Sequence, residues 1–156
     1  MTDIKIRDYE NSDAEDLNRI AVSAFDQYRD QYQDWPAMLA SLSKTSALSA
    51  TGEIIVAEFQ KQFARAVAYF GPNSRKALFF DQRWPVIRML VVDPAFRGNG
   101  LGRALSTERD GAAIIALYTS PIMTVALPMY LKMGFIKAYD APPIFGVAYA
   151  VYTKAL

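Results

Sequence analysis

IRMLVVDPAFRGNGLGRAL, residues 87–105, is an apolar run that leads into a glycine-rich segment. Residues 86–92 are apolar at every position except Arg88, which predicts a central strand buried on both faces. The run ends at Asp93-Pro94, and residues 97–102, RGNGLG, predict a turn that opens a helix from Gly100 to about Asp110. The stretch therefore predicts a strand, a phosphate-sized turn and a helix in direct succession.

Such a turn is an anion-binding site, because the first amides of a helix lack intrahelical partners and carry partial positive charge. Gly98, Gly100 and Gly102 allow a ligand to approach the backbone closely. Arg97 and Arg103 flank the turn with guanidinium groups suited to phosphate oxygens. We interpret the turn as a cradle for a pyrophosphate.

Two common nucleotide-binding motifs do not fit this turn. The Walker motif requires a Gly-Lys pair, and the chain contains none. The dinucleotide fingerprint G-x-G-x-x-G would require glycine at position 103, where Arg103 stands. A different phosphate-bearing ligand is therefore expected.

Residues 97–102, following a strand that ends in Val-Asp-Pro, resemble motif A of the GNAT superfamily of N-acetyltransferases. A second segment, ALPMYLKMGF at residues 126–135, resembles the family's motif B, A-x-x-x-Y-x-K-x-G-F. The two motifs and the strand between them cover roughly residues 86–139, and two ordered motifs make the resemblance specific. It implies that the chain binds acetyl-CoA as a co-substrate, with its pyrophosphate on the turn.

The resemblance also implies which residues hold acetyl-CoA. The backbone of Leu90, Val91 and Val92 would bond the acetyl and pantetheine arm, whereas their side chains form a buried strand. The turn residues expected to contact the cofactor are Arg97, Gly98, Asn99, Gly100, Leu101, Gly102 and Arg103. Met123 stands where motif B often has asparagine, so one polar contact to CoA is missing or replaced.

Tyr130 is the expected general acid, because motif B places a tyrosine near the CoA sulfur at this position. A phenol with a pKa of about 10 protonates a thiolate only with help from geometry or the transition state. The alternative is that Tyr130 is a packed helix aromatic.

Composition bounds the chemistry. A length of 156 residues fits one compact domain over residues 1–156, and 17 Lys and Arg against 16 Asp and Glu argue against a nucleic-acid partner. With neither cysteine nor histidine, the chain lacks a thiol nucleophile and the commonest metal ligands, so no metal is expected. No apolar run is long enough to span a bilayer, and residues 1–8 lack a signal-peptide core. We therefore expect a cytoplasmic protein without a membrane partner.

The elements before the central strand are predicted from periodicity and turn signals. Ser12–Glu15 is a capping-box pattern that opens a helix with an apolar face from Leu17 to Tyr28. The other expected elements are a strand at 4–7, a helix at 36–48 and a hairpin of strands 53–59 and 63–70.

After the glycine-rich turn, residues 113–118 predict a strand parallel to 86–92. Ser120-Pro121 predicts the start of the motif B helix, and Gly134 predicts its end. Pro128 predicts a kink in this helix or its division into two short segments. The last expected elements are a strand at 135–139, a loop at Ala141–Pro143 and a strand at 147–153.

This order resembles the GNAT acyl-CoA N-acyltransferase fold. The fold class expected is α/β, with a seven-stranded, mostly antiparallel mixed sheet, a parallel central pair and helices on both faces.

Several residues leave their roles open. A base that deprotonates the acceptor is not identifiable among Glu53, Glu58 and Asp81, and water is an alternative. Arg88 could bind a carboxylate-bearing substrate or have a structural role, which we favour slightly. Four aromatic residues match the region where family members build the acceptor pocket: Phe25, Tyr28, Tyr32 and Trp35. Core packing explains Phe25 better, and the roles of the other three stay open.

The leading hypothesis is an N-acetyltransferase that transfers the acetyl group of acetyl-CoA directly to a primary amine. A small-molecule amine is the expected acceptor, and a protein amine and a homodimer stay open. One alternative is a catalytically silent acyl-CoA-binding or sensing domain, suggested by the missing asparagine and the lack of an evident base. Transfer of a longer acyl group is another.

Overall fold

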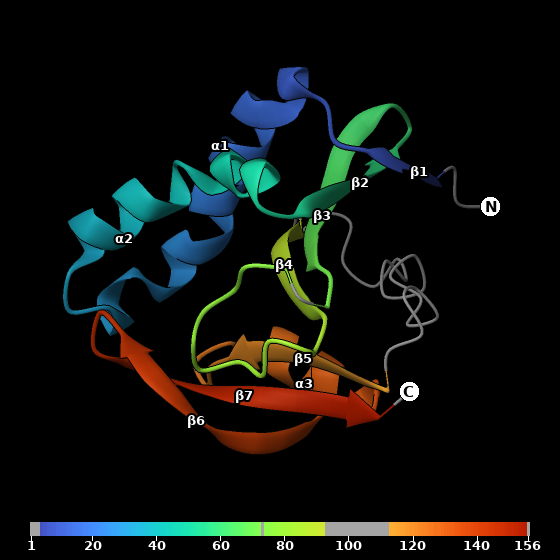
Figure 1. Ribbon diagram of the computed structural model, residues 1–156. Coiled ribbons are helices and arrows are strands. Elements are labelled where there is room, and N and C mark those ends of the chain that lie inside the picture. Colours follow the sequence, from blue (N-terminus) through green and yellow to red (C-terminus); the bar gives the residue numbers. More distant parts are fainter. Residues whose placement is uncertain (1–3, 73, 93–112, 156) are drawn as a thin grey trace.

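Seven strands form one mixed sheet in the order β1-β2-β3-β4-β5-β7-β6, with helices on both faces (Figure 1). The computed structural model describes residues 4–72, 74–92 and 113–155. The strands are β1 (Ile4–Asp8), β2 (Glu53–Phe59), β3 (Gln62–Phe70), β4 (Val86–Val92), β5 (Ile114–Thr119), β6 (Ile136–Ile144) and β7 (Val147–Ala155). The α-helices are α1 (Ala14–Phe25), α2 (Trp35–Leu42) and α3 (Ala126–Lys132).

The pairing confirms the expected fold class. β4 and β5 are parallel, and every other pair of neighbouring strands is antiparallel. β4 lies in the middle of the sheet, as its apolar composition predicts. Residues 93–112, which include the predicted turn and its helix, lie outside the described residues.

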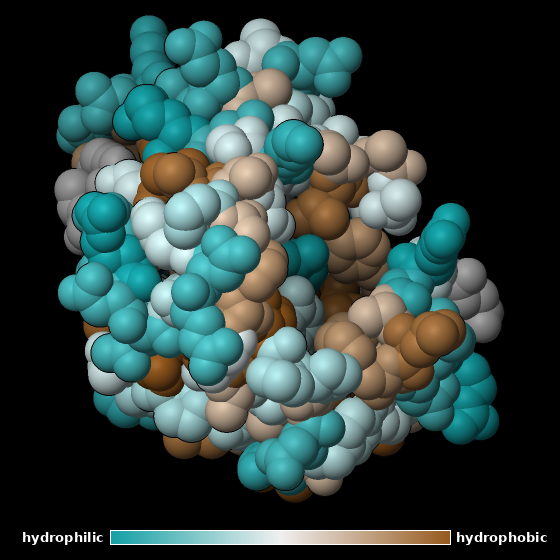
Figure 2. All heavy atoms as spheres, turned by 90° about the vertical axis from the view of Figure 1, so that its left-hand side faces the viewer, coloured by the Kyte–Doolittle hydropathy of each residue, from teal (hydrophilic) through white to brown (hydrophobic). Residues whose placement is uncertain are grey.

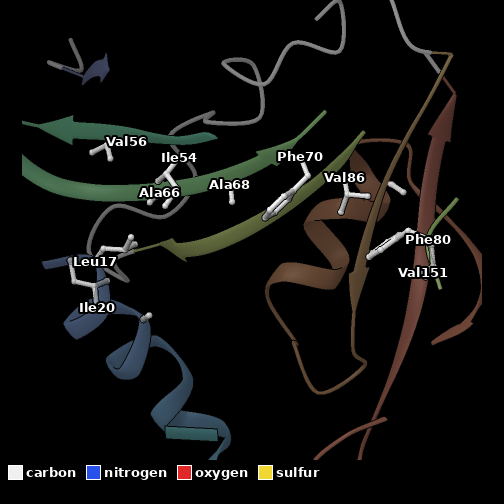
Figure 3. Packing of buried hydrophobic residues seen from close by; sticks show 12 residues of the cluster. Leu17, Ile20, Ile54, Val56, Ala66, Ala68, Phe70, Phe80, Val86 and Val151 are labelled. Carbon is white, nitrogen blue, oxygen red and sulfur yellow. The ribbon is translucent and has the colours of Figure 1, made fainter. Parts of the chain in front are cut away.

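The first face of the sheet is covered by α1. Leu17 and Ile20 of α1 pack against alternate residues of the strands, including Val56 and Ala66 (Figure 3). Val86, Ala116 and Val151 carry the same cluster across β4, β5 and β7. Because alternate strand residues face opposite sides, one apolar layer thus spans the central strands on this face.

The opposite face is covered by α3. Tyr130 of α3 and Phe135 after it pack against the other alternate set, including Ile87, Ile115 and Leu117. Gly134 has φ +101° and its amide bonds the carbonyl of Leu131, so the predicted end of this helix is confirmed. The motif B segment is therefore fixed to the sheet on both sides of its helix end.

The hairpin of β2 and β3 has a two-residue turn at Gln60-Lys61. Both residues have positive φ, 51° and 67°, as turns that match the twist of a hairpin require. The predicted hairpin is confirmed, with β3 starting at Gln62.

Three predictions about helix limits are wrong. A carboxylate oxygen of Asp13, and not the Ser12 hydroxyl, accepts a hydrogen bond from the Glu10 amide at 2.8 Å before α1. α1 ends at Phe25, and a 3₁₀ helix over Asp26–Gln31 continues it. α2 ends at Leu42, because the Ser43 and Thr45 hydroxyls donate to carbonyls of its last turn, and a 3₁₀ helix follows at Thr45–Ala50.

The prediction that Pro128 kinks the helix or divides it into two segments is also wrong. α3 begins at Ala126, so Pro128 lies in its first turn, where an absent amide leaves no helical bond unmade. Ser120-Pro121 does not open the helix; the Ser120 hydroxyl instead accepts the amide of Ile122 at 3.3 Å in a turn.

The predicted loop at Ala141–Pro143 belongs to β6. This strand lies at the edge of the sheet, where proline is tolerated because its missing amide need not pair. The register of β6 with β7 shifts between Ala141 and Ile144, which accommodates the two prolines.

The start of α1 is tied to the sheet by Arg7. Its guanidinium donates to both carboxylate oxygens of Asp13 at 2.8 Å and to Glu58 at 2.6 Å. Asp13 is buried, and the hydrogen bonds from Arg7 outweigh that burial and lower its pKa. One arginine therefore connects β1, β2 and the residues that precede α1.

We predict that Asp13→Asn lowers the free energy of unfolding at pH 7 by about 2 kcal/mol, because it leaves Arg7 with an unpaired site. A carboxyl with a lowered folded pKa stabilises the fold above its unfolded pKa, near 3.8, and this contribution is lost as pH falls. The difference between the two proteins should therefore shrink below about pH 4. Urea unfolding at pH 3–7 measures it.

The matched control is Asp16→Asn, which breaks an exposed ion pair with Arg19 and should cost less than about 0.5 kcal/mol. A similar cost for both variants at pH 7 would contradict the role of Arg7.

Candidate active site

The parallel strands β4 and β5 meet only at one end. Their register pairs one position, Val86 with Ala116, whereas β3 and β4 pair from Phe70 to Arg65. In the described part of these strands, the side of β4 toward β5 is therefore unpaired beyond Val86. Its backbone N–H and C=O groups there are available to a ligand.

A β-bulge lies in the same part of β4. Ala66 pairs with Val91 and Val67 pairs with Met89, so Leu90 is the extra residue. The bulge breaks the regular ladder within the segment whose backbone was expected to bond the acetyl-CoA arm. Of the expected contacts, Leu90, Val91 and Val92 thus lie on a strand with an unpaired side.

A cleft of about 1030 Å³ opens where the two strands separate. Ile87 and Arg88 line it from β4, and Leu117 and Tyr118 line it from β5. Figure 2 shows this side of the molecule hollowed, with hydrophobic residues inside. Neighbouring residues on each strand point to opposite faces, so the cleft has access to both sides of the sheet.

On the α3 side, Tyr130 lines the cleft with Met129 and Met133. Tyr130 is 6% exposed, and its ring packs edge-on against Phe135 at 6.0 Å. Burial raises the pKa of its phenol well above the ordinary value. Its hydroxyl makes no hydrogen bond with any described residue. Because its pKa is raised, the phenol stays protonated and can donate a hydrogen bond to a ligand in the cleft.

On the α1 side, Tyr118 is the common member of three aromatic ring contacts. Its ring contacts Phe79 and Phe80 at 5.7 Å each and Tyr149 at 5.6 Å. The guanidinium of Arg88 lies 5.5 Å above the same ring. Arg88 thus reaches the cleft, although the sequence slightly favoured a structural role for it.

The four aromatic residues proposed for the acceptor pocket separate into two groups. Phe25 and Tyr28 line the cleft and also pack against a buried cluster that includes Tyr32, so the core packing expected of Phe25 is confirmed. Tyr32 is buried beneath the cleft, and its hydroxyl lies 2.6 Å from that of Tyr149. Trp35 packs beside Tyr32 at 6.2 Å and is not among the lining residues.

The carboxylates considered as bases lie elsewhere. Glu58 binds Arg7, and Arg83 holds the pKa of Asp81 at about 2, so neither is a ready proton acceptor. Glu53 contributes to a separate shallow pocket beside Gly71 and Ser74. None of the three lines the cleft.

The charged residues that line the cleft within the described ranges are all cationic: Lys44, Arg65, Arg88 and Lys132. Sequence reasoning missed Lys44 and the two tyrosines Tyr118 and Tyr149, which also line it. No local pattern marks these residues, because β5, β7 and the turn that follows α2 bring them together from distant parts of the chain.

The expected turn contacts Arg97 to Arg103 lie outside the described residues. Met123, which replaces the motif B asparagine, is buried and lines the cleft. Within residues 4–72, 74–92 and 113–155, no group of three potential metal-ligating side chains occurs. No helix in those ranges has the length and apolar character needed to cross a membrane.

A family model for the acetyltransferase (GNAT) domain matches residues 50–137, more than half of the chain. The chain belongs to the GNAT acetyltransferase family. The match contains the separated strands, the bulge and Tyr130, and it confirms the family that the two motifs resemble. The described architecture is therefore that of a GNAT domain.

Solved structures share this fold across nearly the whole chain. A GCN5-related N-acetyltransferase from Rhodopseudomonas palustris aligns with 21% identity and a TM-score of 0.71, covering 97% of this chain and 95% of its own. The protein yncA from Salmonella typhimurium, solved with its cofactor acetyl-CoA, aligns with 18% identity and a TM-score of 0.62, covering 97% and 93%.

A chimera of spermidine N-acetyltransferase SpeG from Vibrio cholerae with hSSAT aligns with 16% identity and a TM-score of 0.64, covering 97% of this chain and 95% of its own. No curated protein matches the sequence. At these identities, the structural likeness establishes the shared GNAT fold.

The hydrogen bond between the Tyr32 and Tyr149 hydroxyls is expected to stabilise the part of the cleft that Tyr149 lines. Burial and the bond to Tyr32 raise the pKa of Tyr149, so both groups remain protonated near neutral pH. We predict that Tyr32→Phe and Tyr149→Phe each lower the free energy of unfolding by about 1 kcal/mol, with the double variant well short of the sum. Urea unfolding of the four proteins measures this coupling.

Tyr152→Phe is the control, because the Tyr152 ring is buried and its hydroxyl has no hydrogen bond within the described residues. Strictly additive losses for Tyr32 and Tyr149 would show that their hydroxyl bond does not stabilise the wall.

Proposed function

We propose that this GNAT protein is an acetyl-CoA-dependent N-acetyltransferase that transfers acetyl directly to a primary amine. The observation that carries the proposal is the separation of β4 and β5 beyond Val86, which leaves unpaired backbone beside a cleft lined by Tyr130. The acetyl-CoA bound to the similar fold of yncA and the amine named for SpeG support the same pair of substrates.

The residues of β4 fit the thioester arm. Because β5 leaves the inner side of β4 unpaired and Leu90 interrupts the opposite ladder, the backbone of Leu90, Val91 and Val92 can bond the arm in place of a strand. The amides of residues 98–103 would hold the pyrophosphate beyond the end of this strand.

The acyl transfer itself exchanges one bond for another. The amine nitrogen bonds the acetyl carbon, and the bond from that carbon to sulfur breaks. Nitrogen loses one proton and sulfur gains one, so no external acid or base is consumed overall.

Tyr130 would assist sulfur departure by donating its phenolic hydrogen as negative charge develops there. Since burial keeps this phenol protonated at neutral pH, the donor is present before the reaction begins. Burial also makes the phenolate costly, so a hydrogen bond that strengthens in the transition state is expected to precede full proton transfer.

We predict that Gly100→Val abolishes measurable CoA binding, because a branched side chain blocks close approach of a phosphate to the turn. Calorimetric titration of both proteins with CoA tests this, and a matched thermal unfolding measurement shows whether the variant is folded. Ala113→Val is a control outside the turn, on an exposed residue before β5, and should bind CoA normally. Equal affinity in wild type and Gly100→Val would reject the cradle.

We predict that Tyr130→Phe lowers kcat by roughly 10²- to 10⁴-fold while CoA affinity stays within about threefold, because only the phenolic hydrogen is removed. A thiol-release assay from pH 6 to 9 measures kcat, and calorimetry measures affinity. Wild-type turnover in the variant would assign Tyr130 to packing alone. CoA binding without turnover by the wild-type protein on any amine would favour the silent acyl-CoA-binding alternative.

A further inference from the structure

Arg88 is a cation placed on an otherwise apolar central strand. The sequence of β4 is VIRMLVV, and the two residues that precede Arg88 on this strand, Val86 and Ile87, are almost fully buried. Arg88 pairs across the sheet with Ala68, whose side chain belongs to the layer beneath α1. Its side chain therefore enters the cleft from the α1 side, opposite Tyr130.

Among the described residues, the Arg88 guanidinium has an aromatic partner but no anionic one. It lies over the Tyr118 ring, and no carboxylate within residues 4–72, 74–92 and 113–155 forms an ion pair with it. Stacking on a ring uses the face of the guanidinium and leaves the N–H fork at its edge free to donate. The fork is thus available to an anion that enters the cleft.

That anion is distinct from the cofactor's pyrophosphate. Arg88 precedes Val92 by four residues, or about 13 Å along an extended strand. The glycine-rich turn begins only after the strand has ended, at Arg97. The cleft thus offers an anion site on the acceptor side, well before the phosphate end of β4.

The surroundings of Arg88 define the rest of the ligand. Phe25 and Tyr28 line the cleft on the same side as Tyr118, which favours an apolar or aromatic group next to the anion. The described charged residues of the cleft are all cationic, so an acceptor with several positive charges would be repelled.

We propose that Arg88 binds the carboxylate of the acceptor, so that the acceptor is an α-amino acid or a close analogue with an apolar or aromatic side chain. This inference rests on the proposed N-acetyltransferase function and names its substrate class. The Arg88 fork pairs with the carboxylate, the side chain contacts the rings of the α1 side, and the amine points toward the opening between β4 and β5. Arg88 is therefore a specificity residue that contacts substrate without taking part in bond exchange.

The test uses acceptors that differ only in their carboxylate. Three amino acids, phenylalanine, tryptophan and leucine, are compared with their amides and with phenethylamine, tryptamine and isopentylamine, and spermidine represents polyamines. A thiol-release assay gives kcat/KM for each. Wild type should prefer at least one amino acid over both of its counterparts that lack the carboxylate by 10-fold or more, and spermidine should be a poor acceptor.

Arg88→Met keeps the apolar stem over Tyr118 and removes the fork. It should lower kcat/KM for the preferred amino acid about 10- to 100-fold and leave the matching amine and amide within about threefold. Arg88→Lys should recover only part of the loss, because a lysine cannot bond a carboxylate with two parallel N–H groups. Arg83→Gln removes an equal charge from an exposed pair with Asp81 and should change nothing.

Calorimetric titration with the N-acetylated form of each amino acid, in the presence of saturating CoA, reads the same contact without turnover. Binding to wild type that is lost in Arg88→Met supports the proposal. Equal binding to both proteins, no binding to wild type, or an amino-acid preference that survives in Arg88→Met overturns it. If amines are acetylated with no preference for a carboxylate, the proposed substrate class is wrong and the transferase function stands. If CoA binds and no acceptor is acetylated, the transferase function fails, and the titration alone tests whether Arg88 binds a carboxylate.

Discussion

The cleft exists because two parallel strands, β4 and β5, pair at a single position in the described residues. β4 is held on its outer side by β3, and β5 is held on its outer side by β7, both through antiparallel ladders. Their inner sides meet at Val86 and Ala116 and then separate. Because the outer ladders carry the hydrogen bonding that keeps each strand in place, the inner backbone can remain unpaired and bind a ligand.

Packing around the junction keeps the two parts of the sheet together. Val86 and Ala116 belong to an apolar cluster that also includes Val151 of β7 and Leu17 of α1. On the other face, Ile87 and Leu117 share a second cluster with Tyr130. The strands are therefore fixed at their paired end by buried side chains on both faces.

Much of the fold could be predicted from local sequence, because it depends on short-range rules. The apolar run at 86–92 has the composition of a doubly buried strand, and Gly134 adopts the positive φ that ends α3. The failures have a different cause. Pro128 and Pro142 break helix or strand only in particular positions, and their positions depend on where α3 starts and on β6 being an edge strand.

The site was less predictable, since its residues come from elements that are far apart in sequence. Tyr130 could be singled out from its motif, and Arg88 stood out as a charge within an apolar strand. Tyr118, Tyr149 and Lys44 carry no such signal, and they join the site only because β5, β7 and the end of α2 border the same cleft. The sequence left the base unidentified among Glu53, Glu58 and Asp81, because the ion pairs of Glu58 with Arg7 and of Asp81 with Arg83 are visible only in the folded chain.

The cationic lining of the cleft would affect both the proposed choice of acceptor and the proposed transfer to it. Surrounding cations raise the free energy of an ammonium ion and so favour the neutral amine that attacks a thioester. The same cations attract a carboxylate. In an α-amino acid, the carboxylate carbon and the amine nitrogen are bonded to the same carbon atom. An acceptor of this kind would gain affinity from the group that binds Arg88 while its amine is driven toward the reactive form. A cleft lined in this way can favour transfer without a carboxylate base of its own, which fits the positions of Glu53, Glu58 and Asp81 outside it.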